Sequence, residues 1–250
     1  MQTIHERTIN DLVAENYLRA SVLYYLGVNF YDNEERTLRE VCADCGLNIQ
    51  TVIKSLESVH EKNQVSELRL MAYPIDLVVQ YLKHSHSVFV KKRLAYIAQL
   101  IDGLGEVNYR YQSLASDLKT VFPLFVEDFI HHIHEEEDSL FVYIKQLKDF
   151  LAGDNHGTRL FYTMERKLIS EYAIDHEEHE HEMDGIRKIT NDYTYCDEAD
   201  LHIRVLYNEL KNFESDLLMH AKIEDDILLP KALQLEKLVK LRFYDIIKQN

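Results

Sequence analysis

The sequence predicts an all-α protein, namely an up-down-up-down four-helix bundle preceded by a small N-terminal helical module. The chain has 250 residues but only 7 glycines and 3 prolines, so residues that break helices are scarce. Apolar residues recur at helical spacing over stretches of about 30 residues, each long enough for a helix of roughly 45 Å. Long helices joined by short loops are typical of a bundle.

The N-terminal module is predicted to span residues 1–62 as several short helices. Thr8 or Asn10 is suited to cap the first helix, and Asn48 is suited to cap the fourth. Gly46 is expected to end the third, because glycine tolerates the left-handed backbone found there. A short polar linker follows the module.

The bundle is predicted for residues 74–234. Its long helices are expected at about 74–102, 111–150, 158–193 and 197–233. Gly103 and Gly105 should end the first of them. Residues 235–250 form a C-terminal tail that could add one short helix outside the bundle.

Composition restricts the compartment and the partners. The formal net charge of −15 argues against nucleic acid or an anionic membrane as the main partner. The chain contains no membrane-spanning apolar run and no signal-peptide pattern. Cys42, Cys45 and Cys196 cannot all pair, so we expect a cytoplasmic protein. Cys42 and Cys45 are interpreted as buried helix thiols rather than as metal or redox residues.

Two segments of the predicted bundle are near-duplicates, FVEDFIHHIHEEEDSLF at 125–141 and FESDLLMHAKIEDDILL at 213–229. Each repeats aspartate, histidine and glutamate at steps of four residues, as Asp128, His132 and Glu136 and as Asp216, His220 and Glu224. Residues four apart share one face of an α-helix. The apolar positions that the segments share place the imidazoles on the core side.

Carboxylates and imidazoles that face a dry core are costly unless a cation accompanies them. Nitrogen and oxygen ligands together suit iron, zinc or manganese better than calcium. Two bridging carboxylates with several histidines suit a two-ion centre. Asp128 and Asp216 could accept the second N–H of their histidines, or could be exposed helix aspartates. The competing interpretation of both segments is a pair of solvated acidic helices.

Further histidines are available on the first and third helices. His86 shares the apolar face of the first helix, and His84 lies at its boundary, so His86 is preferred. On the third helix only one or two of His176, His179 and His181 can face the core, and the apolar register disfavours His179.

With these residues in hand, the chain resembles the repair-of-iron-centres proteins, hemerythrin-like di-iron proteins implicated in restoring iron–sulfur clusters damaged by nitric oxide or oxidants. The matching motifs are H-x3-E-E-x2-LF at 132–141, E-H-x3-G at 180–185 and H-x3-E-x3-LLP at 220–230. The resemblance covers nearly the whole chain. The N-terminal module is similar to the family's leading domain, and the bundle is similar to its hemerythrin-like domain.

The resemblance implies a centre of four histidines and two bridging glutamates. The implied ligands are His86 (or His84), His132, His181, His220, Glu136 and Glu224. They would hold two iron ions, with manganese or zinc as substitutes. The implied function is iron–sulfur cluster repair as an iron donor, closer to a metal-binding protein than to a conventional enzyme. The implied partners are damaged iron–sulfur proteins and nitric oxide or oxygen, and the sequence leaves a homodimer open.

The N-terminal module departs from the family pattern at one place. The family's module usually carries adjacent cysteines before its next helix, where this chain has Tyr31-Asp32-Asn33-Glu34. A thiol role of the module is therefore in doubt.

Three other functions compete with iron–sulfur cluster repair. The first rival is an oxygen or nitric oxide binding or sensing protein, which would not need the module. A di-iron oxidase is disfavoured by the four-residue steps, since such enzymes use Glu-x2-His. The third rival is a metal-free bundle.

Overall fold

The structure, a computed structural model, describes residues 3–58, 67–107, 111–153, 157–166, 169–170, 172, 183–196 and 198–249. Within these ranges every regular element is a helix, and extended pairing is limited to an isolated bridge between Thr8 and Thr37. The predicted all-α class is therefore confirmed. None of the described helices is long and apolar enough to cross a membrane.

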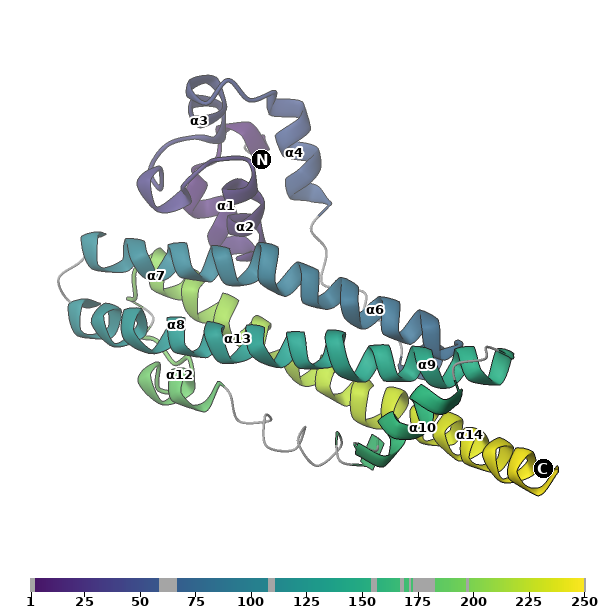
Figure 1. Cartoon of the computed structure of the whole chain (residues 1–250). Helices are drawn as coiled ribbons and strands as arrows, with labels where there is room; N and C mark the ends of the chain where they lie inside the picture. Colours follow the sequence, from purple (N-terminus) through teal and green to yellow (C-terminus); the bar gives the residue numbers. More distant parts are fainter. Residues whose placement is uncertain are drawn as a thin grey trace. The chain divides into compact units, whose positions relative to one another are not determined.

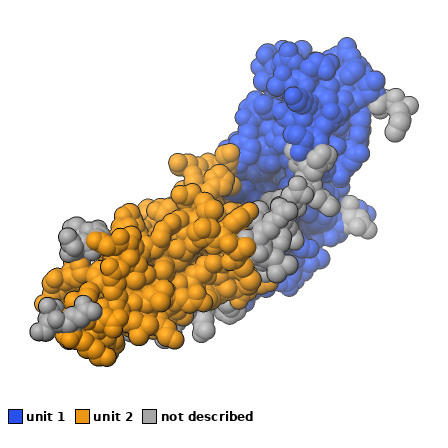
Figure 2. Space-filling view, turned by 90° about the vertical axis from the view of Figure 1, so that its right-hand side faces the viewer, with its two compact units in different colours: residues 1–64, 93–121, 186–214 blue, residues 65–92, 122–185, 215–250 orange. Residues whose placement is uncertain are grey.

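The chain divides into two compact units, which Figure 2 shows in different colours. Unit 1 comprises residues 1–64, 93–121 and 186–214, and unit 2 comprises residues 65–92, 122–185 and 215–250. Neither unit is one continuous segment of the chain. The sequence-based division at residues 62, 74 and 234 follows chain order instead, and it stays a prediction.

Short helices with polar caps form the N-terminal part of unit 1. They are η1 (Ile4–Glu6), α1 (Ile9–Glu15), α2 (Leu18–Tyr25), η2 (Phe30–Asp32), α3 (Leu38–Asp44) and α4 (Ile49–Glu57). The Thr8 hydroxyl accepts the backbone N–H of Asp11, so Thr8 rather than Asn10 caps α1. Asn48 caps α4 as predicted. Gly46 follows α3 with a left-handed φ of 65°, as its predicted role requires.

The two cysteines near the end of α3 differ in exposure. Cys42 is buried, as predicted, and burial raises the pKa of its thiol. Cys45 is exposed, which corrects the prediction that both thiols are buried. The physical reason is that Cys45 is the C-terminal cap of α3, where the chain leaves the packed face of the helix.

The other elements are mostly long helices that contain π-helical turns (Figure 1). They are α5 (Glu67–Ala72), α6 (Ile75–Val88), η3 (Phe89–Leu94), α7 (Ala95–Val107), α8 (Gln112–Glu135), η5 (Glu136–Leu140), α9 (Phe141–Ala152), α10 (Gly157–Arg166), α12 (Asp184–Ile189), α13 (Leu201–Ile223), η6 (Glu224–Leu228) and α14 (Leu229–Gln249). The turns η3, η5 and η6 are the π-helical ones.

Each of the four predicted long helices corresponds to some of these elements. The second is α8–η5–α9, and Gly153 ends it with a φ of 107°. The fourth is α13–η6–α14, which runs on to Gln249, so the expected C-terminal tail is a continuation of α14. The third is represented by α10 and α12, and residues 167–168, 171 and 173–182 of its span lie outside the described residues.

The first predicted helix corresponds to α6–η3–α7 and runs on to Val107, past the glycines expected to end it. Gly103 serves close packing instead of termination. A Cβ at this position would lie 3.1 Å from Cε1 of His202 and 3.3 Å from Cζ of Tyr31. Glycine therefore lets two rings approach the helix backbone more closely than a larger residue would.

The hydrophobic core of unit 2 is formed mainly by residues of α6, α9, η6 and α14. Its buried residues are Leu70, Ile75, Val78, Leu82, Leu140, Phe141, Tyr143, Ile144, Leu147, Phe150, Leu160, Met164, Ile169, Ile223, Ile227, Leu228, Leu229, Ala232 and Val239. Helix α14 packs on α9, and η6 packs on α6. This packing fixes the positions of η5 and η6, which carry the twin glutamates.

A buried histidine in unit 1 holds η2 against α7. The ring of His202 stacks on Tyr31 with centroids 4.5 Å apart, and its Nε2 donates to the Leu100 carbonyl at 2.7 Å. His202 is only 1% exposed, and this burial lowers the pKa of its imidazole despite the hydrogen bond to Leu100 and the nearby Asp32 and Asp200. The folded protein therefore favours neutral His202.

This burial predicts a loss of stability in acid. The unfolded chain binds a proton at His202 near the ordinary pKa of about 6.5, whereas the folded chain resists it. The free energy of unfolding is therefore fully retained above that pH and falls as the pH drops below it. Urea unfolding followed by circular dichroism at neutral and mildly acidic pH should show a larger loss for the wild type than for His202→Gln, which keeps an N–H donor. Equal losses in the two proteins would contradict the assignment.

Candidate metal centre

The near-duplicate segments also match in their local structure. His132 lies in the last turn of α8, and Glu136 is the first residue of the π-helical turn η5. In the same way, His220 lies in the last turn of α13, and Glu224 is the first residue of η6. The shared apolar positions Phe125, Phe129, Leu140, Phe213 and Leu228 are buried, and Leu217 is partly buried. A π-helical turn often marks a functional site in a helix. Both twin glutamates occupy the first position of such a turn.

Four side chains from unit 2 converge in a buried cluster. His86, Glu136, His220 and Glu224 are 2%, 6%, 8% and 1% exposed. One ligand atom from each lies within 4.8 Å of the others. The two Nε2 atoms of His86 and His220 are 2.9 Å apart, His86 Nε2 is 3.1 Å from Glu136 Oε2, and His220 Nε2 is 3.2 Å from Glu224 Oε1.

Glu136 has an imidazole near each of its two carboxylate oxygens. Oε2 faces His86, and Oε1 lies 3.1 Å from Nε2 of His132, whose side chain is 13% exposed. A carboxylate placed in this way can bind one cation through each oxygen.

Aromatic rings surround the imidazoles. The ring of His86 stacks on Phe141 with centroids 6.0 Å apart, and Phe89 meets His220 edge to face at 5.6 Å. Phe129 lies behind Phe89 at 6.1 Å. These walls exclude water, so charges within the cluster interact more strongly than they would at the surface.

The electrostatics of the cluster favour a positive charge. Burial alone would lower the pKa of His86, but the hydrogen bond and charge of Glu136, the hydrogen bond to Glu137 and the charge of Glu224 outweigh it, so the pKa of His86 is raised. Two Nε2 atoms 2.9 Å apart can share only one hydrogen. A divalent cation could accept lone pairs from both imidazoles and both carboxylates. This donor set fits a transition metal such as iron, manganese or zinc.

The structure distinguishes between candidates that the sequence left open. His84 is exposed and His86 is buried in the cluster, so the structure brings His86 rather than His84 to the other donors. His181, His176 and His179 lie outside the described residues.

The carboxylate groups beside the imidazoles can now be compared with those expected from the sequence. Asp128 is exposed, which matches the alternative interpretation of an exposed helix aspartate, and Asp216 is partly buried. The carboxylate at Nδ1 of His86 is Glu137, at 2.9 Å, and it comes from another helix. Sequence reasoning missed Glu137, although it stands in the E-E motif beside Glu136.

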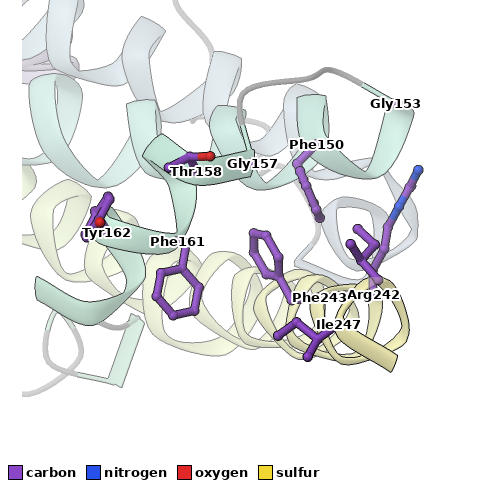
Figure 3. A pocket seen from close by; sticks show the side chains of 10 residues that line it. Phe150, Gly153, Gly157, Thr158, Phe161, Tyr162, Arg242, Phe243 and Ile247 are labelled. Carbon is purple, nitrogen blue, oxygen red and sulfur yellow. The ribbon is translucent and has the colours of Figure 1, made fainter. Parts of the chain in front are cut away.

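Unit 2 also contains a pocket whose lining differs in chemistry from the metal-ligand cluster. A pocket of about 550 Å³ lies between the ends of α9, α10 and α14 (Figure 3). It is lined by Phe150, Gly153, Gly157, Thr158, Phe161, Tyr162, Arg242, Phe243, Ile246 and Ile247. No histidine or carboxylate is among these residues, so this pocket offers no metal ligands of the kind found in the cluster.

A set of helices around buried imidazoles and carboxylates is typical of one class of protein, the helical metal-binding bundle. Residues 77–232 match the family described as Hemerythrin HHE cation binding domain, so the chain belongs to the hemerythrin family. The hemerythrin-like bundle expected from the motifs is thereby confirmed, and the chain carries a cation-binding domain.

The chain is also similar to three curated proteins over most of its length. It is 19% identical to "Iron-sulfur cluster repair protein ScdA" of Staphylococcus epidermidis over 229 residues, which is 91% of this chain and 98% of the relative. It is 22% identical to "Iron-sulfur cluster repair protein YtfE" of Dickeya chrysanthemi over 217 residues, 86% and 92% of the two chains. ScdA of Staphylococcus haemolyticus is 16% identical over 227 residues, 91% and 98% of the two chains.

The neighbouring histidines of α6 provide a matched pair for testing the centre. We expect His86→Ala to lower the metal content of protein purified without a tag, because it removes one of four converging donors. His84→Ala changes an exposed side chain two residues away and should leave the content unchanged. Elemental analysis of both variants and the wild type measures this. Equal metal content in all three proteins would contradict the placement of His86 in the centre.

Proposed function

We propose that the protein is a non-haem di-iron protein that repairs iron–sulfur clusters damaged by nitrosative or oxidative stress, by donating iron to them. The observation that carries the proposal is the buried cluster of His86, Glu136, His220 and Glu224. Its support from similarity is that relatives named iron–sulfur cluster repair proteins align with more than four fifths of this chain, the lowest share among those named above being 86%.

The proposed ligands are divided between two iron positions. His86 and His220 would share one iron, since their Nε2 atoms lie 2.9 Å apart. His132 would bind the second iron beside Oε1 of Glu136, together with His181. Glu136 and Glu224 would bridge the two positions. Bound iron would supply open coordination positions for nitric oxide or oxygen, and an ion that can be transferred.

The chain's own groups favour donation over permanent retention. Without a metal, Glu136, Glu137 and Glu224 raise the pKa of the His86 imidazole despite its burial, so the cluster favours the protonated ring. A proton can therefore replace part of the positive charge when iron leaves. This limits the cost of the metal-free state, in which two buried carboxylates would otherwise face each other across a dry interior.

The proposal needs no thiol chemistry from the N-terminal module. The stretch where the family usually has adjacent cysteines forms η2 and its flank here, with Tyr31 stacked on His202. Cys42 is buried and its pKa is raised, which disfavours the reactive thiolate. The proposed partners are damaged iron–sulfur proteins, in the cytoplasm. Homodimer formation is a separate proposal that a sedimentation measurement can decide.

Transfer of labelled iron tests the donor function. The wild type, loaded anaerobically with ⁵⁷Fe, is mixed with a [4Fe–4S] enzyme whose cluster has lost one iron by oxidation, in the presence of a reductant. We expect the label to enter the recipient cluster, seen by Mössbauer spectroscopy, and the enzyme's activity to recover. His86→Ala should transfer less iron than His84→Ala, its matched control.

Two outcomes would count against donation. If the label stays with the protein while nitric oxide or oxygen binds reversibly, the protein is a carrier or sensor of these gases. If free ferrous iron at the same concentration restores the cluster equally fast, the protein contributes nothing to the transfer.

A further inference from the structure

Glu137 stands beside the proposed iron centre but belongs to none of the ligand positions. It is the second residue of η5, and its side chain is 32% exposed. Its Oε1 lies 2.9 Å from Nδ1 of His86. Consecutive carboxylates therefore contact the two nitrogens of one ring, because Oε2 of Glu136 lies 3.1 Å from Nε2 of His86.

We propose that Glu137 is a positioning residue, which accepts the Nδ1–H of His86 and so fixes the tautomer whose Nε2 lone pair points at the metal. The inference rests on the proposed metal centre and extends it. A neutral imidazole carries one hydrogen, so a hydrogen held on Nδ1 leaves Nε2 as the acceptor. By accepting the Nδ1–H, the carboxylate also raises the basicity of Nε2, which makes the ring a stronger metal ligand.

The other contact of Glu137 is weaker. Nζ of Lys83 lies 3.8 Å from its Oε2, and the Lys83 side chain is 44% exposed. An exposed ion pair at this distance is screened by water and contributes little. The contact to His86 is shorter, is charge-assisted and involves a ring that is almost fully buried, so it dominates the orientation of the Glu137 side chain.

The second half of the near-duplicate is built differently. Nδ1 of His220 is buried and has no hydrogen-bond partner among the described residues. The position equivalent to Glu137 is Asp225, which is exposed and one methylene shorter. Among the described residues, carboxylate support at Nδ1 is therefore a property of His86 and not of His220.

Three substitutions test this assignment on the full-length protein. Glu137→Ala removes the acceptor, Glu137→Gln keeps an oxygen acceptor without the charge, and Asp138→Ala is the matched control at an exposed neighbour. The affinity for ferrous iron is measured anaerobically by competition with a chromogenic chelator. The far-ultraviolet circular dichroism and thermal midpoint of the metal-free proteins are recorded alongside.

We expect Glu137→Ala to weaken iron binding about 10–100-fold, the usual cost of losing such a partner. Glu137→Gln should lie between Glu137→Ala and the wild type, and Asp138→Ala should match the wild type. With cobalt(II) in place of iron, the visible absorption of Glu137→Ala should change in position or intensity, since the ring is no longer held. A purely structural role would lower the metal-free thermal midpoint without this spectral change.

Other results would overturn the inference. Iron affinity of Glu137→Ala within about twofold of the wild type would show that His86 needs no acceptor at Nδ1. An equal loss in Asp138→Ala would indicate a general charge effect. If Glu137→Ala does not fold, Glu137→Gln decides: a loss of affinity with an unchanged metal-free midpoint supports the role, and unchanged affinity refutes it. Failure of the wild type to bind iron would instead contradict the proposed function.

Discussion

The constraint on which the rest of the structure depends is the burial of two carboxylates and two imidazoles at one point in unit 2. His86, Glu136, His220 and Glu224 lie within 4.8 Å of one another and are almost fully removed from water. Negative charge in such surroundings is tolerated only when positive charge is placed beside it. The carboxylates raise the pKa of His86 despite its burial, so the cluster favours a positive charge on that ring. A divalent cation satisfies the same demand with more charge and more bonds.

The same local arrangement of histidine, glutamate and π-helical turn occurs twice and places these groups in the core. In both near-duplicate segments, a histidine precedes a glutamate by four residues, and the glutamate opens a π-helical turn. Apolar residues on either side anchor each turn in the core, so packing holds both turns in place. The imidazole of His86 enters from α6 and stacks on the ring of Phe141. Membership of the hemerythrin family agrees with this use of helices as a scaffold for cation binding.

Much of this could be predicted from the sequence, and the failures have physical causes. The apolar register predicted that His86 rather than His84 faces the core, because a helix repeats every 3.6 residues. The twin spacing predicted that Glu136 and Glu224 face the same core. Glu137 was missed, since neighbours on a helix usually point about 100° apart, and the π-helical turn is not visible in the spacing. The role of Gly103 was also missed, because a glycine that admits the rings of Tyr31 and His202 looks in sequence like one that ends a helix.

The central claim is that the buried cluster binds a divalent transition-metal cation, and thermal unfolding of the wild type tests it most directly. The measurement compares the midpoint in excess chelator with the midpoint in ferrous iron under anaerobic conditions, and with the midpoint in calcium. Ligand at about 100 times its dissociation constant adds roughly 2.7 kcal/mol to the free energy of unfolding. The account predicts a clear rise in the midpoint with iron and none with calcium, which prefers oxygen ligands. The same midpoint in iron, calcium and chelator would contradict it.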